Sequence, residues 1–259
     1  MKKRRVFIIF GMLFLLCFFF LPLSRAQAKD QESVKVLFIG NSYTFFNSMP
    51  QMFVRIARQK GYQVDIDLIA PGGWTLSKHS ANQATLSKIK QTRWDYVVLQ
   101  EQSIIPSVSS YRMKNMYPAA RKLDRMIRRS GAKTIFFMTW GRRNGLAKHG
   151  FRNYKEMQMR VSSGYMTIAK ELNATVAPVG LAFQKARLDA PLLDFWEQDN
   201  SHPNQMGSYL AACVFFSVIF QESPQGTGDP YNLGQTKAAY LQKVAAETVL
   251  SNRKRWNLP

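Results

Sequence analysis

The chain has 259 residues, of which 46% are hydrophobic, which is enough for one sizeable folded domain. No Pro/Ser/Gly-rich linker, internal repeat or low-complexity block argues for a second domain. The 36 Lys and Arg residues against 16 Asp and Glu give a formal charge of +20, which favours polyanionic partners such as acidic polysaccharide or lipid headgroups. Because no zinc-finger spacing or aromatic RNA-binding signature accompanies this charge, nucleic acid is not an expected partner.

The first 28 residues have the pattern of an export signal. A basic stretch from Lys2 to Arg5 precedes an apolar run over residues 6–23, and Ala26-Gln27-Ala28 is a small-x-small cleavage site. Cleavage after Ala28 predicts a periplasmic or secreted protein of residues 29–259 with no stable membrane span. An uncleaved membrane anchor is the alternative, because the apolar run is close to the shortest that crosses a bilayer.

Signal removal takes away Lys2 to Arg5 and Arg25 but no acid, so the formal charge falls from +20 to +15. The mature chain keeps one cysteine, Cys213, which therefore has no partner for an internal disulfide. Since Cys213 lies inside an apolar run, we interpret it as a small core residue.

The remaining chain alternates between strand-like and helix-like segments. Strands are expected at 34–39, 63–70, 96–100, 134–139 and 175–179, and helices at 49–60, 82–90, 113–129, 154–172 and 205–220. This alternation predicts a parallel sheet with helices on both faces. From about residue 223 the chain should pack on the same domain, with a helix near 233–250 and a solvated basic tail.

The first strand stops at Gly40, and Ser42 follows just before a helical segment. A serine on such a strand-to-helix turn is well placed to be a nucleophile, because unpaired backbone amides at the helix start can stabilise an oxyanion. The alternative is an ordinary polar turn in which Ser42 caps the helix. This stretch alone leaves both interpretations open.

Polar or aromatic residues follow the other strands. Ligands bind beyond the carboxyl ends of a parallel sheet, so these turns should face one crevice. Gly72 and Gly73 can bring backbone amides close to a ligand, and Gln100 and Gln102 offer side-chain amides, although ordinary turns and solvated loops have the same composition. Trp74 and Trp140 are candidates to stack on a sugar face.

The segment Asp199-Asn200-Ser201-His202-Pro203 offers a general base with a carboxylate three residues before it. The proline should keep His202 on a loop ahead of the 205–220 helix. The other histidines, His79 and His149, have no carboxylate nearby in sequence, and we interpret both as surface residues.

Taken in order, Ile39 to Ser42, Gly72-Gly73, Gln100 to Ser103 and Asp199 to Asn204 resemble the blocks of the SGNH (GDSL-type) hydrolases over roughly residues 34–220. The resemblance implies an α/β fold, a flavodoxin-like three-layer α/β/α sandwich with a five-stranded parallel sheet. It also implies ester hydrolysis through an acyl-enzyme, with Ser42 as nucleophile, His202 as base and Asp199 as its orienting carboxylate. The oxyanion donors would be the amides of Ser42 and of Gly72 or Gly73, with a third-block amide side chain.

This chain departs from the family pattern in two blocks. Asn41 stands where aspartate is usual, beside the nucleophile and within reach of substrate. The third block lacks the usual Gly-x-Asn-Asp, and its Gln100-Glu101-Gln102-Ser103 is similar to the Gln-Gly-Glu-Ser of carbohydrate acetylesterases, which favours Gln100 over Gln102 as donor.

The expected function is therefore an exported serine esterase that removes short acyl groups, acetyl above all, from carbohydrate or cell-wall glycan. The chain shows no metal-ligand cluster, and the mechanism needs no cofactor. The expected partner is an acylated small molecule or polysaccharide, anionic in view of the basic charge. The sequence leaves open an acyltransferase, a non-enzymatic glycan-binding protein, and the oligomeric state.

Overall fold

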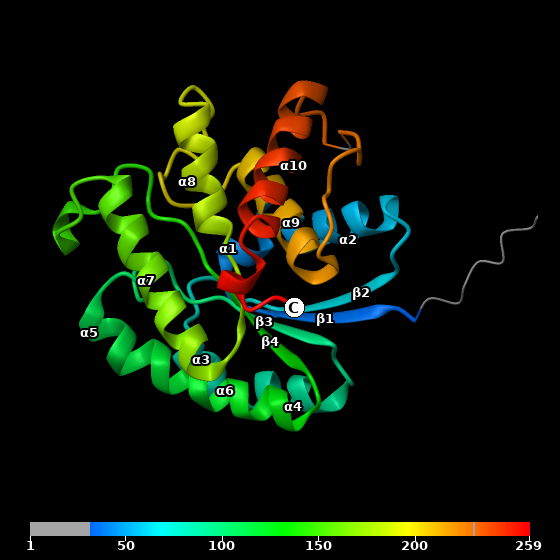
Figure 1. Cartoon of the computed structure of the whole chain (residues 1–259). Helices are drawn as coiled ribbons and strands as arrows, with labels where there is room; N and C mark the ends of the chain where they lie inside the picture. The colour runs from blue at the N-terminus through cyan, green and yellow to red at the C-terminus, as the bar shows by residue number, and fades with distance from the viewer. Residues whose placement is uncertain (1–31, 230) are drawn as a thin grey trace, which may run out of the picture. The chain divides into compact units, whose positions relative to one another are not determined.

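Five parallel strands form one sheet in the order β2-β1-β3-β4-β5, in a computed structural model that describes residues 32–229 and 231–259 (Figure 1). The predicted parallel sheet with helices on both sides is confirmed. Its strands are β1 (Val34–Ile39), β2 (Val64–Ile69), β3 (Tyr96–Leu99), β4 (Lys133–Phe137) and β5 (Thr175–Ala177).

The central strands are apolar throughout because both of their faces are covered. Ile39 pairs with Leu99, and Leu99 pairs with Phe136, and all three side chains are fully buried. The carboxyl ends of β1, β3 and β4 are thus aligned at one edge of the sheet.

Helices pack on each face of the sheet (Figure 1). The first layer contains α1 (Ser42–Phe45), α2 (Met49–Gln59), α8 (Val179–Asp189), α9 (Gln205–Phe220) and α10 (Gln235–Leu250). The second contains α3 (Leu76–Ala81), α4 (Gln83–Gln91), α5 (Ser109–Tyr111), α6 (Tyr117–Arg129) and α7 (Tyr154–Leu172). Short 3-10 turns lie at Phe46–Ser48, Ala147–His149 and Arg253–Trp256, and a π-helical turn at Arg112–Met116 joins α5 to α6.

Helix α9 is apolar on all sides because it contacts both α2 and α10. Cys213 is fully buried in it, as expected for a core residue, and this burial raises the pKa of its thiol. The C-terminal segment also packs on the domain: Trp256 is buried and its Nε1 donates to the Thr248 carbonyl at 3.0 Å. The basic residues 253–255 just before it are exposed, as expected.

The strand order creates a switch point between β1 and β3. After β1 the chain crosses to β2 on one side, whereas after β3 it crosses to β4 on the other side. Loops that diverge in this way leave a crevice between them at the carboxyl edge of the sheet. Ser42 follows β1 and the Gln100–Ser103 block follows β3, so both lie at this switch point.

Residues Glu32–Pro259 form one unit by their contacts. The predicted export signal lies outside the described residues. Within residues 32–229 and 231–259, no helix has the length and apolar character that a bilayer span requires.

Candidate active site

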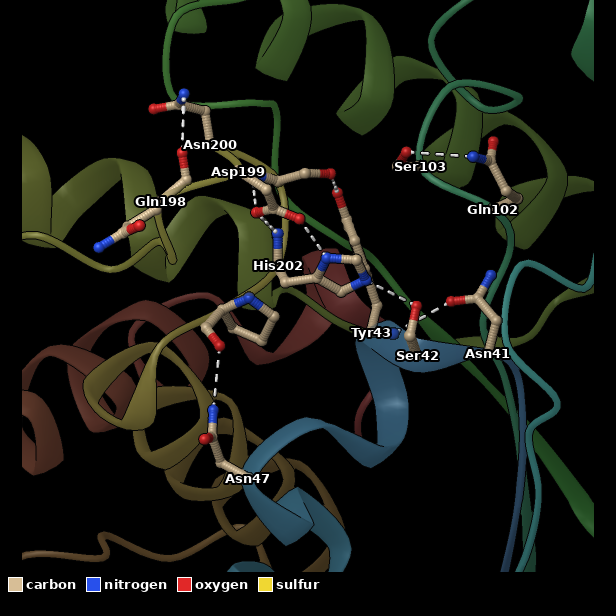
Figure 2. A network of polar contacts seen from close by, with 12 residues as sticks. Asn41, Ser42, Tyr43, Asn47, Gln102, Ser103, Gln198, Asp199, Asn200 and His202 are labelled. Atoms are coloured by element: carbon tan, nitrogen blue, oxygen red, sulfur yellow. Dashed lines mark hydrogen bonds and ion pairs between the residues drawn. The ribbon is translucent and has the colours of Figure 1, made fainter.

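The structure brings Ser42, His202 and Asp199 into one hydrogen-bonded chain (Figure 2). Ser42 is the first residue of α1, and its Oγ lies 2.8 Å from Nε2 of His202. Nδ1 of the same imidazole is hydrogen-bonded to Oδ2 of Asp199. Because the carboxylate engages Nδ1, Nε2 is the nitrogen that faces the serine hydroxyl and is available to accept its proton.

Backbone hydrogen bonds fix the loop that carries the acid and the base. Oδ1 of Asp199 accepts the amide hydrogens of Ser201 and His202, each at 2.9 Å. Asn200 adopts a left-handed conformation with φ 59°, which lets the loop turn within these few residues. The His202 carbonyl accepts the amide of Glu197 at 2.9 Å, which anchors the far side of the loop.

The same hydrogen bonds set the charge of Asp199. Burial would raise the pKa of its carboxyl, but the bonds from the His202 ring and from the two backbone amides outweigh this effect. The pKa of Asp199 is therefore held below its ordinary value. The carboxylate stays ionised and can stabilise an imidazolium.

Aromatic rings hold the imidazole in place. Phe46 stacks on the His202 ring with a centroid distance of 4.3 Å, and the Tyr43 ring meets it edge-on at 5.4 Å. The Tyr43 hydroxyl is 2.5 Å from Oγ of Ser201, which ties this ring to the loop of the base. Both rings follow the serine within four residues, but no sequence pattern distinguished them from ordinary core aromatics.

Asn41 is a helix cap. Its Oδ1 accepts the amide of Tyr43 at 3.1 Å, and its Nδ2 donates to the Trp74 carbonyl at 2.8 Å. The residue is only 2% exposed. The structure thus gives Asn41 a role in joining the first and second loops, instead of the predicted contact with substrate.

The prediction that Gln100 donates to an oxyanion is wrong. Its side chain is fully buried, and its Oε1 accepts the Asn41 amide at 2.7 Å and the Thr44 hydroxyl at 3.0 Å. Two donors converge on this oxygen, so the carboxamide cannot flip, and its Nε2 donates to the Glu101 carbonyl at 2.5 Å. A Cβ at Gly40 would collide with the same oxygen, which explains the glycine there.

Gln102 remains a candidate donor. It is half-buried, its Oε1 accepts the Ile104 amide at 2.9 Å, and its Nε2 lies a long 3.4 Å from Ser103 Oγ. Figure 2 shows Gln102 on the same side of the view as Asn41, across the site from Asp199. Its Nε2 hydrogens are therefore less committed to protein partners than those of Gln100.

Gly72 and Gly73 form an exposed turn that the Trp74 amide closes on the Pro71 carbonyl at 3.2 Å. Gly73 has φ 69°, a conformation that favours glycine. The role of either amide as an oxyanion donor stays a prediction, as does contact between substrate and the half-buried Trp74.

Trp140 cannot stack on a sugar, contrary to our prediction. It is fully buried, with its ring stacked between Tyr43 at 4.9 Å and Phe183 at 4.5 Å. Its Nε1 donates to the Ser201 carbonyl at 3.0 Å. Trp140 is thus a core residue that supports the loop of the base from beneath.

The expected surface position of His79 is wrong. It is fully buried instead of exposed, with its Nε2 2.7 Å from the Gly40 carbonyl and its Nδ1 3.2 Å from Thr85 Oγ1. Burial lowers the pKa of this imidazole, so the neutral form is favoured there. His149 is half-exposed beside Tyr111.

Glu101 is a buried carboxyl to which sequence analysis assigned no role. Its Oε1 accepts the amides of Gln102 at 2.7 Å and Leu76 at 3.1 Å, so it joins the third loop to the start of α3. Its Oε2 is buried with no hydrogen-bond partner. Burial raises the pKa of Glu101 to about 7, despite the two amides, which lower it.

In the described part of the chain, no three His, Cys, Asp or Glu side chains are grouped so that they could hold a metal ion. The chemistry that the arrangement offers is nucleophilic attack by Ser42 with proton transfer to His202. The Ser42 amide is the first of its helix and has no acceptor within that helix, so it can meet an oxyanion.

One family model, described as a domain of unknown function (DUF4886), matches residues 75–249. The match begins after Ser42. No curated protein matches the sequence.

Solved structures share the fold. A DUF4886 family protein from Bacteroides uniformis is 19% identical with a TM-score of 0.74, covering 85% of this chain and 95% of its own. A putative SGNH hydrolase from Slackia heliotrinireducens is 27% identical with a TM-score of 0.60, covering 71% of this chain and 98% of its own. An acetyl xylan esterase from Geobacillus stearothermophilus is 14% identical with a TM-score of 0.54, covering 70% and 92%. The three-layer fold is therefore that of the SGNH hydrolases.

Proposed function

The chain belongs to the DUF4886 family, and because the function of that family is unknown, we propose from the site itself that this member is a serine esterase of the SGNH type. The observation that carries the proposal is the chain of hydrogen bonds from Ser42 through His202 to Asp199 at the switch point of the sheet. The similarity of the fold to SGNH hydrolases and acetyl xylan esterases supports the same reaction class.

The reaction has two halves. Oγ of Ser42 attacks the ester carbonyl while Nε2 of His202 takes the hydroxyl proton, and Asp199 stabilises the imidazolium that forms. The tetrahedral intermediate collapses to an acyl-serine as the imidazolium protonates the departing alcohol. Water then attacks the acyl group with His202 again as base, and the acid leaves as Ser42 recovers its proton.

The oxyanion of each intermediate requires donors on the side of Ser42 away from Asp199. We assign the backbone amide of Ser42, an amide of Gly72 or Gly73, and Nε2 of Gln102 to this role. Gln100 is replaced in the assignment by Gln102 because the carboxamide of Gln100 is buried, with its oxygen accepting the Asn41 amide and its nitrogen donating to the Glu101 carbonyl. Gln100 acts indirectly by holding the turn that presents Ser42.

The proposed substrate is a short-chain ester, acetyl above all, on a carbohydrate. Two of the solved structures with this fold are acetyl xylan esterases. Trp74 stands half-buried beside the loop of the nucleophile, where its ring can contact a sugar. The sequence pattern of residues 1–28 supports export. An exported protein would meet the glycans of the cell wall and of the surroundings.

The test compares wild type with Ser42→Ala and with Ser163→Ala, which removes an exposed hydroxyl on α7. Hydrolysis of a short-chain aryl ester should fall to background in Ser42→Ala and stay at the wild-type rate in Ser163→Ala. Equal background rates from all three proteins would exclude the esterase. Acetate release from a panel of acetylated glycans then identifies the substrate, whereas transfer of acetyl to an added glycan would identify a transferase.

A further inference from the structure

A basic cavity adjoins the loop that carries Asp199 and His202. It has a volume of about 560 Å³ and lies between the start of α7, the end of α8 and the segment after β4. No carboxylate lines it. Its charged lining residues are all cations: Arg143, Arg152, Lys155 and Arg187.

Two of these cations form ion pairs with carboxylates that do not line the cavity. Arg143 pairs with Asp194 at 2.8 Å, and Arg152 pairs with Glu156 at 2.7 Å. Within the described residues, no carboxylate forms an ion pair with Lys155 or Arg187. The cavity therefore keeps an excess of positive charge, and a bound anion would relieve the mutual repulsion.

The guanidinium of Arg187 is held in a fixed orientation. Its guanidinium lies over the Tyr154 ring at 4.9 Å and over the Trp196 ring at 5.3 Å. One terminal nitrogen, Nη1, donates to the Arg143 carbonyl at 2.9 Å. A guanidinium fixed by two rings and one hydrogen bond presents its other donors in a set direction, which suits a planar carboxylate or a phosphate.

A backbone hydrogen bond joins the cavity lining to the loop of the candidate active site. The Arg143 amide donates to the Asn200 carbonyl at 3.0 Å, and Asn200 follows Asp199 directly. Figure 2 shows Asn200 on the far side of Asp199 from Ser42. A ligand that reaches both the cavity and Ser42 must therefore pass around this loop, as an oligosaccharide of several units can.

A fifth cation lies on the active-site side of the same segment. Arg142 precedes Arg143, its Nε is buried with no hydrogen-bond partner, and its charge acts on the Tyr43 hydroxyl. Buried polar atoms without partners are rare in folded proteins, because each leaves a desolvation cost that no hydrogen bond offsets. Cations are thus present both near the Tyr43 ring, which contacts His202, and in the cavity.

We propose that the cavity binds the carboxylate or phosphate of an acidic sugar, and that the substrate is an O-acylated acidic glycan. The proposal rests on the proposed esterase function for the role of Ser42, but the binding of the anion does not. One anionic unit occupies the cavity against Arg187 and Lys155, while another unit, further along the same oligosaccharide, presents its ester to Ser42.

The experiment measures binding to Ser42→Ala protein by calorimetry at low salt, so that no hydrolysis contributes. The probes are a short oligogalacturonate, an uncharged xylo-oligosaccharide of the same length, and a phosphorylated oligosaccharide that distinguishes the two anions. We expect at least one anionic probe to bind and the uncharged one not to bind. The double variant with Ser42→Ala and Arg187→Gln should bind the anionic probe about tenfold more weakly, or weaker still.

Two further variants control for folding and for net charge. Lys155→Gln changes an exposed side chain and should weaken binding in the same direction with an unchanged melting temperature. Lys237→Gln removes the same charge from an exposed position on α10 and should leave the affinity as it is. Failure of both anionic probes to bind, or an equal loss in Lys155→Gln and Lys237→Gln, would overturn the proposal. Specific binding by a protein without esterase activity would overturn the proposed function instead.

Discussion

Replacement of Glu101 by glutamine should remove a large part of the pH dependence of stability. The carboxyl is fully buried, and one of its oxygens has no partner. Glutamine has nearly the same shape and its Oε1 can still accept the two amides, but it cannot ionise. The variant therefore isolates the effect of the buried charge.

The magnitude follows from the pKa of Glu101. Burial raises the pKa from an ordinary value of 4.5 to about 7 in the folded protein. Because the folded pKa is the higher one, the stabilising contribution is fully present below pH 4.5 and is lost as the pH rises through about 7. The full difference corresponds to about 3 kcal/mol of unfolding free energy.

Urea unfolding of wild type and Glu101→Gln at pH 4.5 and at pH 8 measures this contribution. Between these two values the wild-type protein should lose about 3 kcal/mol more than the variant does. All other titrating groups are common to both proteins, so they cancel in the comparison. Parallel pH profiles would show that Glu101 titrates normally and would refute the argument from burial.

Two further variants test the site and its support, and a third tests the packing of α8 beneath it. Asp199→Asn should lower kcat on an aryl ester by about 10⁴-fold, because the amide cannot hold the imidazole in the required tautomer, and a near-wild-type kcat would remove the carboxylate from the mechanism. Gln100→Ala should lower stability by roughly 1–3 kcal/mol by leaving the Asn41 amide without an acceptor, and an unchanged melting temperature would contradict its structural role. Gly180→Ala should cost about 1–3 kcal/mol in urea unfolding because a Cβ there overlaps the Thr139 carbonyl, and full stability would show that the backbone gives way.

The sheet could be predicted from sequence because its strands are buried on both faces and read as continuous apolar runs. The first strand is observed at Val34–Ile39 as expected, and the long helices α7 and α9 have the predicted bounds. The ends of the strands were predicted less accurately than their positions. The run at 175–179 ends as a strand at Ala177, because Val179 already begins α8.

The elements that sequence analysis missed are short or uniformly buried. Helix α3 has six residues, too few for a clear apolar period, and α8 packs against α7, α9 and α10 so that its apolar face is not distinct. The segment expected as one helix at 113–129 contains a π-helical turn at Arg112–Met116 before α6 begins. Local periodicity carries no signal for such a turn.

At the site, sequence spacing was enough to select Ser42, Asp199 and His202 as a set that the fold brings together. It was not enough to orient individual side chains. Gln100 and Gln102 differ by two positions in one loop, yet one is in the core and the other is half-buried. That difference depends on donors that come from the first loop, which no local pattern describes.

The most direct test of the central claim is the mass of the protein during turnover of an activated acetyl ester. Wild-type protein quenched in acid should carry one acetyl group, and peptide mapping should find it on Ser42, while Ser42→Ala should carry none. Any acetyl-serine formed in His202→Ala should persist, because the base that activates water is gone. An acetyl group on any other residue, or substrate turnover that continues in Ser42→Ala, would contradict the account.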